Sequence, residues 1–409
     1  MKPDKSTLIA VADALAIVLR ETTQIESREM TLGPKVRGLV LAESISTDVD
    51  SPPYTKALMD GFAVQTNGGV TESQTILRVV EEIAAGKMPT KRVGASEAAR
   101  IMTGAPIPAG ADAVVPIEKT EPVSQNEVRL LVSPKAGQHI LPRGTEMKAG
   151  EVILESGCVL GPQEFGILAS AGRICALVYP RPNIGVLSTG DEIVEPSRFP
   201  GPGQIRNSNS PMLAAQVDRA GGIGANIGIA RDTVESLREL IGKGLAENDV
   251  LILSGGVSAG KFDLVPGVLQ ELGVIAHFQK VSLKPGKPFF FGVKGCKLVF
   301  GLPGNPVSSF VCFELFIRPA IAKLMGRDGC APRQTKLPIA ADFQTDNDRP
   351  TYWPARIEWD SEGPRVRALP WFGSADLRAL HTANALLAIP SGTHRFESGT
   401  RVSVIPLGE

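Results

Sequence analysis

Short loops rich in glycine and proline hold the residues of this chain that are best suited to chemistry. Four of them follow apolar, strand-like runs: STGDE (188–192), SGGVSAGKFD (254–263), KPGKP (284–288) and LPGNP (302–306). Glycine lets backbone amides approach an anion closely, and a helix N-terminus favours negative charge. The charged side chains that these loops carry are Asp191, Glu192, Asp263, Lys284 and Lys287. Carboxylates beside lysines are typical of a site that binds phosphate or another oxyanion together with a hard cation such as Mg²⁺.

The segment 181–330 is expected to bring these loops to one edge of a sheet. In it, strand-like runs such as NIGVLST, DVLILSG and KLVFGLP alternate with helical runs. This alternation is typical of a mostly parallel sheet with helices on both faces, and ligands bind at the carboxyl ends of such strands. The sequence therefore predicts a three-layer α/β domain with a binding site where the loops meet.

Two helix starts in this segment have recognisable signals. Ser210, followed by Pro211, is predicted to cap a helix that ends at Gly221. Asp232 with Glu235 three residues later forms a capping-box pattern, which predicts the start of the next helix.

The corner LPGNP has more rigid residues than a simple turn requires. Asn305 is placed to cap a helix whose first turn holds Pro306. Pro303 and Gly304 stiffen the loop and leave its backbone open, so we interpret them as a rigid wall of the site. A purely structural corner explains both prolines equally well.

Ordinary structural roles stay open for the charged residues too. Asp232 as a helix N-cap needs no ligand, and Asp191 or Glu192 can complement a helix start. Lys284 and Lys287 can be solvated loop charges. The expected convergence of all these loops on one sheet edge favours a site.

The sequence outside the α/β segment predicts further domains. From 51 to 143, glycine and proline punctuate short β-type runs such as ILRVVEEI, which predicts a β-rich inserted domain. The flanking segments 1–50 and 144–180 are predicted to form one discontinuous N-terminal domain. From 331 to 409, runs such as TYWPARIEW predict a small β-barrel-like domain, in which SADLRALHTANALLAIP reads as one helical segment leading into a strand.

Composition narrows the function classes. The 409 residues are 43% hydrophobic, with 43 basic and 43 acidic side chains, so no global charge attracts the chain to nucleic acid or a membrane. The five cysteines are scattered without a C-x-x-C pair, which argues against a zinc site or a disulfide framework and fits the cytoplasm. The N-terminal apolar residues follow helical spacing, unlike a secretion signal.

Three familiar motifs are rejected. GGVSAGK (255–261) resembles a P-loop, but Phe262 stands where Ser or Thr would hold Mg²⁺. GGIGANIG (221–228) follows a helix, which is the wrong context for a dinucleotide fingerprint. None of the four histidines lies beside a credible nucleophile, so no catalytic triad is predicted.

Polar residues outside the α/β segment also stand out. Asp60 lies in KALMDGFAV and Thr103 on a Gly-Ala-Pro turn of RIMTGAPIPAGADAVV. Arg143, Arg349 and Arg356 can act as forks for phosphate or carboxylate, although for each arginine taken singly a surface or structural role is the favoured interpretation.

Several stretches in this order resemble one enzyme family. MDGFAV, RIMTGAPIPAGADAVV, VLSTGDEI, ILSGGVSAGKFD, LKPGKPFFFG, LPGNPVSS and GSADLRALHTANALLAIP together resemble the molybdopterin molybdenumtransferases, which are related to the C-terminal domain of gephyrin. The resemblance spans nearly the whole chain. It implies insertion of molybdenum from molybdate into adenylylated molybdopterin, with Mg²⁺-dependent release of AMP.

The resemblance also implies partners and a fold. It implies four domains, one of them discontinuous, an α/β domain related to the molybdopterin adenylyltransferase, and a homodimer. Transient contact with that adenylyltransferase and with apo-molybdoenzymes is a further expectation, as is a cytoplasmic location.

The functional residues that the resemblance implies match positions of this chain one by one. As catalytic residues it implies Asp60, Thr103, Glu192, Asp232 and Asp263. As substrate or oxyanion-binding residues we expect Lys284, Lys287, Pro303, Pro306, Gly255, Gly256, Gly304, Ser374, Arg143 and Arg349. Glu192 and Asp263 are expected to hold Mg²⁺, and Asp60 and Thr103 to form a second wall, contributed by the same or the partner subunit.

The sequence departs from the family pattern in two places, and two other functions are also considered. Gly144-Thr145-Glu146 replaces the family's more acidic step after Arg143, and DRPTYWPAR adds prolines beside Arg349. The α/β domain alone also fits a molybdopterin adenylyltransferase. A non-catalytic scaffold like the gephyrin domain is the third reading; the retained acidic positions favour an active enzyme.

Overall fold

The computed structural model describes residues 8–67, 69–70, 72–257 and 264–408. Its contacts divide the chain into two compact units. The first combines Met1–Ala42 with Leu177–Glu409, and the second is Glu43–Ala176. The predicted Asp263, Lys261 and Phe262 lie outside the described residues.

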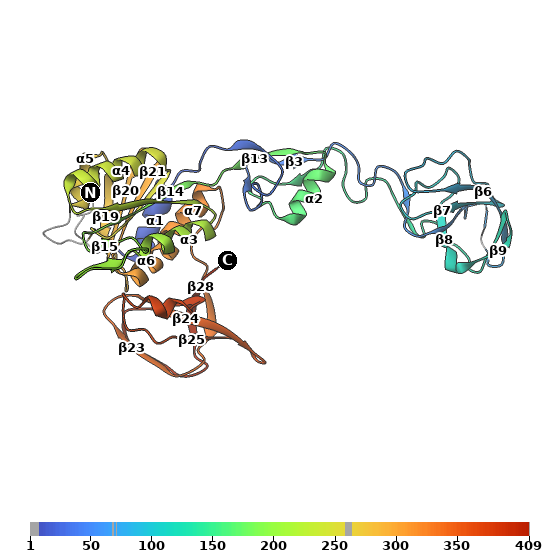
Figure 1. The fold of residues 1–409 in the computed structure, drawn as a ribbon. Helices are drawn as coiled ribbons and strands as arrows, with labels where there is room; N and C mark the ends of the chain where they lie inside the picture. Colours follow the sequence, from blue (N-terminus) through green and yellow to red (C-terminus); the bar gives the residue numbers. More distant parts are fainter. Residues whose placement is uncertain (1–7, 68, 71, 258–263, 409) are drawn as a thin grey trace. The chain divides into compact units, whose positions relative to one another are not determined.

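A six-stranded sheet forms the centre of the first unit (Figure 1). Its strand order is β17-β14-β18-β21-β20-β19, in which the first four strands run parallel and β20 is antiparallel to both of its neighbours, β21 and β19. The strands are β14 (Asn183–Thr189), β17 (Ile223–Ala230), β18 (Val250–Ser254), β19 (Ile275–Lys280), β20 (Pro288–Lys294) and β21 (Lys297–Leu302). The predicted mostly parallel sheet is confirmed.

Helices cover both faces of this sheet, as expected for a three-layer domain (Figure 1). One face carries α4 (Val234–Glu247) and α5 (Val265–Glu271). The other carries α1 (Val11–Glu21), α3 (Asn209–Arg219), α6 (Pro306–Cys312), a π-helical turn η2 (Phe313–Ile317) and α7 (Arg318–Leu324). Leu237, Ile241 and Leu245 recur every four residues along α4, so that one stripe of the helix packs on Leu251 and Leu253 of the sheet.

The predicted helix caps next to the sheet need correction. Ser210 is not the cap of α3: it lies inside the helix, fully buried, and its N–H donates to Asn207 Oδ1 at 3.1 Å. Asp232 is not the cap of α4, because Thr233 holds that position and its Oγ1 accepts from the Ser236 N–H at 3.3 Å. α3 ends at Arg219 with Ala220 as its C-cap, and Gly221, the predicted stop, follows directly with φ +96°.

The start of α6 agrees with the sequence in position but not in bonding. Asn305 occupies the N-cap position and Pro306 is the first helical residue, as predicted. The Asn305 side chain makes no capping bond, however. Its Nδ2 donates instead to Ser374 Oγ at 2.7 Å.

The C-terminal part of the first unit is a small β domain. Its five-stranded sheet has the order β22-β28-β26-β24-β25, and a bridge between Ile339 and Val366 brings the two ends together, so the predicted barrel-like form is confirmed. The strands are β22 (Thr335–Pro338), β24 (Thr351–Asp360), β25 (Gly363–Ala368), β26 (Ala385–Ile389) and β28 (Arg401–Pro406), with β23 (Phe343–Asn347) and β27 (Gly392–Phe396) as a separate ribbon. The helix predicted in SADLRALHTANALLAIP is only the short 3₁₀ turn η3 (Leu377–Leu380).

Shorter strands lie in the first unit or, for β13, across its boundary with the second. β1 (Arg28–Thr31), β13 (Cys175–Tyr179) and β2 (Val40–Leu41) form a three-stranded sheet. β15 (Ile193–Val194) and β16 (Ile205–Arg206) pair in parallel beside the STGDE loop.

The second unit is rich in β structure, as predicted for residues 51–143. Its six-stranded sheet has the order β8-β5-β7-β6-β10-β9. The strands are β5 (Gly61–Val64), β6 (Ile76–Ile83), β7 (Glu97–Ile101), β8 (Ala113–Pro116), β9 (Thr120–Ser124) and β10 (Glu127–Leu130), and the turn η1 is Ile117–Lys119. The same unit contains α2 (Pro162–Ser170) and the paired strands β3 (Ile45–Ser46) with β12 (Val152–Leu154) and β4 (Lys56–Ala57) with β11 (Ile140–Leu141).

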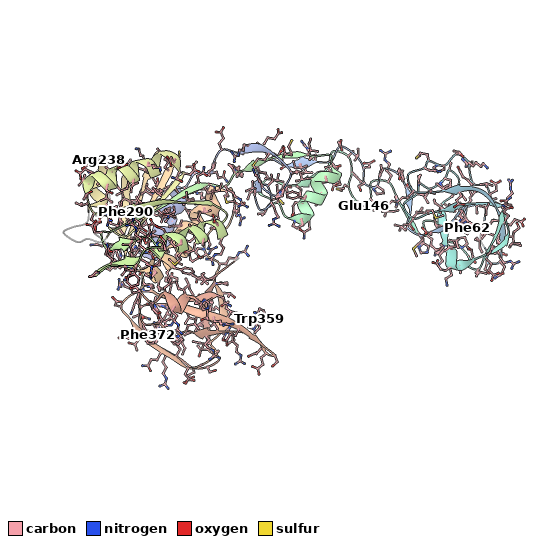
Figure 2. The ribbon with its side chains drawn as sticks, in the orientation of Figure 1. Phe62, Glu146, Arg238, Phe290, Trp359 and Phe372 are labelled. Carbon is pink, nitrogen blue, oxygen red and sulfur yellow. The ribbon has the colours of Figure 1, made fainter. Side chains whose placement is uncertain are left out.

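Side chains follow the usual division between core and surface (Figure 2). Phe290 is buried in the α/β core, whereas Arg238 projects from α4 and pairs with Glu271 in solvent. Trp359 and Phe372, by contrast, are large aromatic side chains that stand exposed. Among the described residues, no helix is long and apolar enough to span a bilayer.

Candidate functional site

A cavity of about 610 Å³ opens in the first unit at the carboxyl ends of the parallel strands. Three of the four loops singled out from the sequence contribute to its lining, through residues such as Glu192, Gly255, Gly256, Gly304 and Pro306. The loops meet there because β14, β18 and β21 run parallel and therefore end at the same edge. The convergence predicted from the sequence is thus found for these three loops.

The Gly255-Gly256 pair is required by close packing at the end of β18. Gly255 has φ +95° and Gly256 φ +62°, both in the region that favours glycine. A Cβ at position 256 would lie 2.6 Å from Thr189 Oγ1 and 2.8 Å from Val265 Cγ2. Gly304 has no comparable constraint, since the nearest atom to its Cβ position, the Gly255 Cα, is 4.0 Å away.

Among the described residues, two carboxylates line the cavity. Glu192 belongs to the STGDE loop and Asp232 to the segment just before α4. The neighbouring Asp191 does not line it; its Oδ1 accepts from the Asp232 N–H at 3.4 Å and its carbonyl oxygen accepts from Arg231 at 3.2 Å. Because Thr233 caps α4, the Asp232 carboxylate is not needed as a helix cap and can interact with a ligand in the cavity.

Hard oxygen ligands of the kind that Mg²⁺ prefers are therefore present in the form of Glu192 and Asp232. Asp263, the other predicted ligand, lies outside the described residues. Within the described part of the chain, no three His, Cys, Asp or Glu side chains form a ready-made metal cluster. The residues present fit a cation that keeps part of its water shell and also binds substrate phosphate.

A buried polar network supports the floor of the cavity, and the sequence did not single it out. Asn209 Nδ2 donates to Ser254 Oγ at 2.8 Å and to the Gly304 carbonyl oxygen at 2.7 Å. The Ser188 hydroxyl donates to Asn207 Oδ1 at 3.0 Å. These bonds tie the start of α3 to the ends of β14, β18 and β21. The available signal was the run NSNS, a polar stretch at the start of a helix.

The C-terminal domain reaches the LPGNP corner. Ser374, a weaker candidate from the sequence, accepts from Asn305 Nδ2 through its hydroxyl and from the Val307 N–H through its carbonyl oxygen at 3.0 Å. Ala375 and Leu377, which follow it, line the cavity. Pro303 does not line it; its carbonyl oxygen accepts from Ser309 Oγ at 2.5 Å.

The KPGKP loop lies at the same edge of the sheet but outside the lining of this cavity. Lys284 is half-buried, and its backbone bonds to the Pro350 carbonyl oxygen at 2.9 Å and to the Tyr352 N–H at 2.8 Å. Lys287 is exposed. Arg349, next in sequence to Pro350, donates through Nε to Asp348 at 3.0 Å. The structure thus brings Lys284 close to the Arg349 segment. It does not place Lys284 in the cavity lining with the carboxylates of Glu192 and Asp232.

Asp60 and Thr103 meet in the second unit. Asp60 Oδ1 accepts from both the N–H and the hydroxyl of Thr103, each at 2.6 Å. These two bonds, the hydroxyl first, hold the pKa of the Asp60 carboxyl below its usual range. Both residues are exposed, so the pair is presented to solvent.

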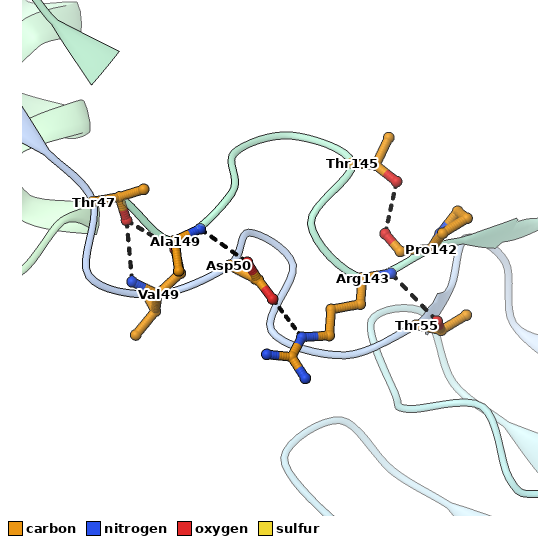
Figure 3. Close-up of polar contacts among 8 residues, drawn as sticks. All are labelled: Thr47, Val49, Asp50, Thr55, Pro142, Arg143, Thr145 and Ala149. Carbon is orange, nitrogen blue, oxygen red and sulfur yellow. Dashed lines mark hydrogen bonds and ion pairs between the residues drawn. The ribbon is translucent and has the colours of Figure 1, made fainter. Parts of the chain in front are cut away.

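Arg143 also lies in the second unit, where it has a partner within the chain (Figure 3). Its Nε donates to Asp50 Oδ2 at 2.5 Å, and the other oxygen of Asp50 accepts from the Ala149 N–H at 2.9 Å. The pair crosses between the two segments that lead into and out of the β-rich domain.

Comparisons with known proteins agree along the whole chain. The molybdopterin molybdenumtransferase of Staphylococcus epidermidis is 33% identical over 408 residues, which cover 99% of this chain and 97% of that protein. The chain belongs to the molybdopterin molybdenumtransferase family. The enzyme of the same name from Staphylococcus aureus is 31% identical over 412 residues, covering 99% of this chain and 97% of that protein. The resemblance stated from the sequence is confirmed.

Structure and family models support the same membership. The solved molybdopterin biosynthesis MoeA protein of Pyrococcus horikoshii superposes with a TM-score of 0.82 at 28% identity, covering 98% of this chain and all of that one. Residues 9–172 match the MoeA N-terminal region (domain I and II), 185–323 a probable molybdopterin binding domain, and 336–407 the MoeA C-terminal region (domain IV). As a molybdopterin molybdenumtransferase family member, the chain has a role in molybdenum cofactor biosynthesis.

The cavity falls almost entirely within one matched region of this family. Apart from Ala375 and Leu377, every lining residue lies within 185–323, the probable molybdopterin binding domain. The carboxylates Glu192 and Asp232 lie in that region as well.

Proposed function

We propose that this chain inserts molybdenum from molybdate into adenylylated molybdopterin and releases AMP in a Mg²⁺-dependent step. The observation that carries the proposal is the cavity of about 610 Å³ at the strand ends, within the region that matches a probable molybdopterin binding domain. Its lining combines glycine-rich backbone with the carboxylates of Glu192 and Asp232. Backbone amides suit phosphate, and carboxylates suit a hard cation.

The backbone of the glycine loops is assigned to the nucleotide phosphates. The Gly255 N–H donates to the Leu302 carbonyl oxygen at 3.1 Å, so the amide that we assign to phosphate is the N–H of Gly256, which has left-handed backbone and no side chain in front of it. Gly304, whose Cβ position is 4.0 Å from the Gly255 Cα, and Pro306 extend this lining, with Pro306 acting through shape.

We assign molybdate to the place where the KPGKP loop contacts the segment around Pro350, outside the lining of the cavity. Lys284 and Lys287 supply positive charge there, and Arg349 lies next to the residue that bonds Lys284. Ser374 is bonded to the start of α6 through Asn305, and we assign its hydroxyl to the oxyanion as well. Pro303 is assigned the role of stiffening the LPGNP corner.

The reaction breaks the phosphoanhydride bond between AMP and molybdopterin. A water molecule or a molybdate oxygen supplies the oxygen that the departing AMP gains, and the dithiolene sulfurs take the molybdenum as molybdate oxygen leaves as water. Bound Mg²⁺ would offset the negative charge that builds up on the phosphate oxygens. Glu192 and Asp263 are the residues assigned to hold it, with Asp232 orienting water beside them.

The second unit is assigned a supporting role. Asp60, kept ionised by Thr103, and Arg143 form a second polar surface for the substrate. We propose that a homodimer in the cytoplasm completes the site, with transient contacts to the adenylyltransferase that makes the substrate and to the apo-molybdoenzymes that take the product. Light scattering of the purified protein checks the dimer.

One incubation tests the proposed reaction. The protein is mixed with adenylylated molybdopterin, molybdate and Mg²⁺, and both AMP and protein-bound molybdenum are measured. Release of AMP with molybdenum retained on the pterin supports the proposal. Formation of adenylylated molybdopterin from ATP would show an adenylyltransferase instead, and absence of both reactions would leave a scaffold. The matches over 9–172 and 336–407 favour the transferase, because these regions lie outside the α/β domain, which is the part that fits an adenylyltransferase.

A further inference from the structure

Arg206 is the single cationic side chain in the cavity lining, among the residues that the structure describes. The other charged side chains in that lining are the carboxylates of Glu192 and Asp232. Lys284 and Lys287, the cations expected from the sequence, do not contribute to it. Among the described lining residues, a phosphate-bearing ligand therefore meets two negative groups and one guanidinium. Of these residues, Arg206 is the one able to offset the ligand's own charge.

The structure holds the Arg206 side chain from two sides. Strand β16 pairs with β15 and sets Arg206 opposite Val194, at the rim of the cavity. Its Nε donates to the carbonyl oxygen of Arg198 at 3.0 Å. Its guanidinium carbon lies 5.8 Å from the centroid of the Phe199 ring. These contacts use one donor and one face of the planar group, so the terminal nitrogens keep their donors for a ligand.

The contact with Arg206 explains an otherwise unusual side chain. Phe199 is 90% exposed, so its apolar ring faces water and packs in no hydrophobic core. Beneath the guanidinium it provides a cation–π platform that restricts the otherwise flexible arginine. An arginine that is already ordered loses less conformational entropy when it binds an anion.

We propose that Arg206 binds a phosphate group of the substrate at the rim of this cavity, with Phe199 and the Arg198 carbonyl oxygen holding the guanidinium in place. The inference rests on the proposed function, because it takes adenylylated molybdopterin as the ligand. Molybdate is also a tetrahedral oxyanion and shares this chemistry. Phosphate is favoured because Gly256, whose left-handed backbone suits phosphate, lines the same cavity.

Binding measurements with AMP, adenosine and molybdate separate these ligands. Titration calorimetry on the full-length Arg206→Ala protein is expected to show AMP affinity lowered about tenfold or more, the effect of losing a charged hydrogen bond. Adenosine, which lacks the phosphate, and molybdate are expected to bind as they do to the unmodified chain. Arg206→Lys is expected to fall between the two proteins, because an ammonium keeps the charge but loses the planar fork.

Two companion variants isolate the cause. Phe199→Ala keeps the charge and removes the platform, so AMP affinity should fall by about two- to fivefold. Arg378→Ala removes an exposed cation next to the lining residue Leu377 and should leave AMP affinity unchanged. In turnover, Arg206→Ala is expected to raise KM with kcat preserved and to weaken the dependence of KM on salt.

Several results overturn the inference. Unchanged AMP affinity in Arg206→Ala does so, and so does an equal loss for adenosine and AMP, which would mean a change in cavity shape. Weakened molybdate binding with normal AMP binding would assign the arginine to the other oxyanion and overturn it as well. The proposed function fails separately, if the unmodified chain does not release AMP.

Discussion

A single carboxylate oxygen of Asp60 accepts two hydrogen bonds from Thr103, one from its N–H and one from its hydroxyl, both at 2.6 Å. The two residues are far apart in sequence and come from separate turns of the second unit. Because both bonds favour the charged form, the pKa of Asp60 lies below its ordinary value. The arrangement keeps an exposed carboxylate ionised and points it in a fixed direction.

Removing the Thr103 hydroxyl should raise the Asp60 pKa toward that of an ordinary aspartate. We expect Thr103→Ala to do this, since the hydroxyl is the largest cause of the shift, and Thr103→Ser to leave the pKa low. The pair contributes stability at pH values above the ordinary Asp pKa, and that contribution is lost as pH falls through the lowered folded value. Carboxyl NMR titration measures both variants; equal titration curves for Ala and Ser would contradict the prediction.

Gly256→Ala should disturb the cavity, because the new methyl group would lie 2.6 Å from Thr189 Oγ1 in a backbone conformation with φ +62°. We expect a loss of about 1–3 kcal/mol in unfolding free energy and weaker AMP binding. Gly242→Ala is the matched control. Gly242 lies within α4 with no atom within 4 Å of its Cβ position, so alanine there should stabilise by about 0.5–1 kcal/mol. Denaturant unfolding that ranks the two variants in the opposite order would refute the packing argument.

Glu192→Gln should lower AMP release and shift its Mg²⁺ dependence to higher concentrations. The change keeps the size of a cavity-lining side chain and removes its charge. We expect Mg²⁺ affinity to fall by about tenfold or more, as for other losses in a metal site. Glu195→Gln alters an exposed carboxylate three residues away and outside the lining, so its Mg²⁺ titration should match that of the unmodified chain. Identical titrations for both variants would remove Glu192 from the cation site.

A buried carboxylate ties the two helices that begin at the cavity. Glu314, in the π-helical turn after α6, accepts from Gln216 on α3 at 2.7 Å and pairs with Arg219 and with Arg318. Its side chain is only 1% exposed. Because α3 and α6 both start at the cavity, this network holds their first residues, Asn209 and Pro306, in a fixed relation.

Glu314→Gln should therefore destabilise the first unit. It leaves Arg219 and Arg318 without a counter-charge, but these arginines are 41% and 24% exposed, so we expect a loss of about 1.5–3 kcal/mol, as for charged hydrogen bonds, and not the full cost of an uncompensated buried charge. The Arg238–Glu271 pair is similar in distance but half exposed, so Glu271→Gln should cost less than about 1 kcal/mol. Urea unfolding compares them. Similar losses in both variants would mean that burial of Glu314 contributes nothing.

The sequence was sufficient to predict the sheet and three of the loops at its edge. Apolar runs such as those of β14 and β18 identify strands locally, and parallel strands must end on the same side. The KPGKP loop was placed at the right edge but not in the cavity, because β20 runs antiparallel and its preceding loop contacts the C-terminal domain at Pro350.

Helix caps and the polar floor could not be predicted in the same way. Asp232 and Thr233 are adjacent residues with similar capping propensity, so local sequence does not decide which one bonds. Asn209 and Ser254 are 45 residues apart, and only the folded sheet brings them together. The pairing of Asp50 with Arg143 spans 93 residues and was equally invisible.

That pairing predicts an acid-sensitive connection to the β-rich domain (Figure 3). The Ala149 N–H first, and then Arg143, hold the pKa of Asp50 below its ordinary value. Its stabilising effect is therefore complete above the ordinary Asp pKa and is lost as pH falls through the lowered folded value. Asp50→Asn should make the segments 47–55 and 142–149 more susceptible to protease at neutral pH.

Limited proteolysis and hydrogen exchange over these segments, from neutral pH to about pH 3, measure the effect. The unmodified chain should approach the behaviour of Asp50→Asn only at the acidic end, because the Asp50 carboxylate then becomes protonated. Asp48→Asn is the control, since Asp48 is an exposed carboxylate of the same segment. If Asp48→Asn loosened the connection as much as Asp50→Asn, loss of charge alone would explain the result, and the specific bonds to Ala149 and Arg143 would not be needed.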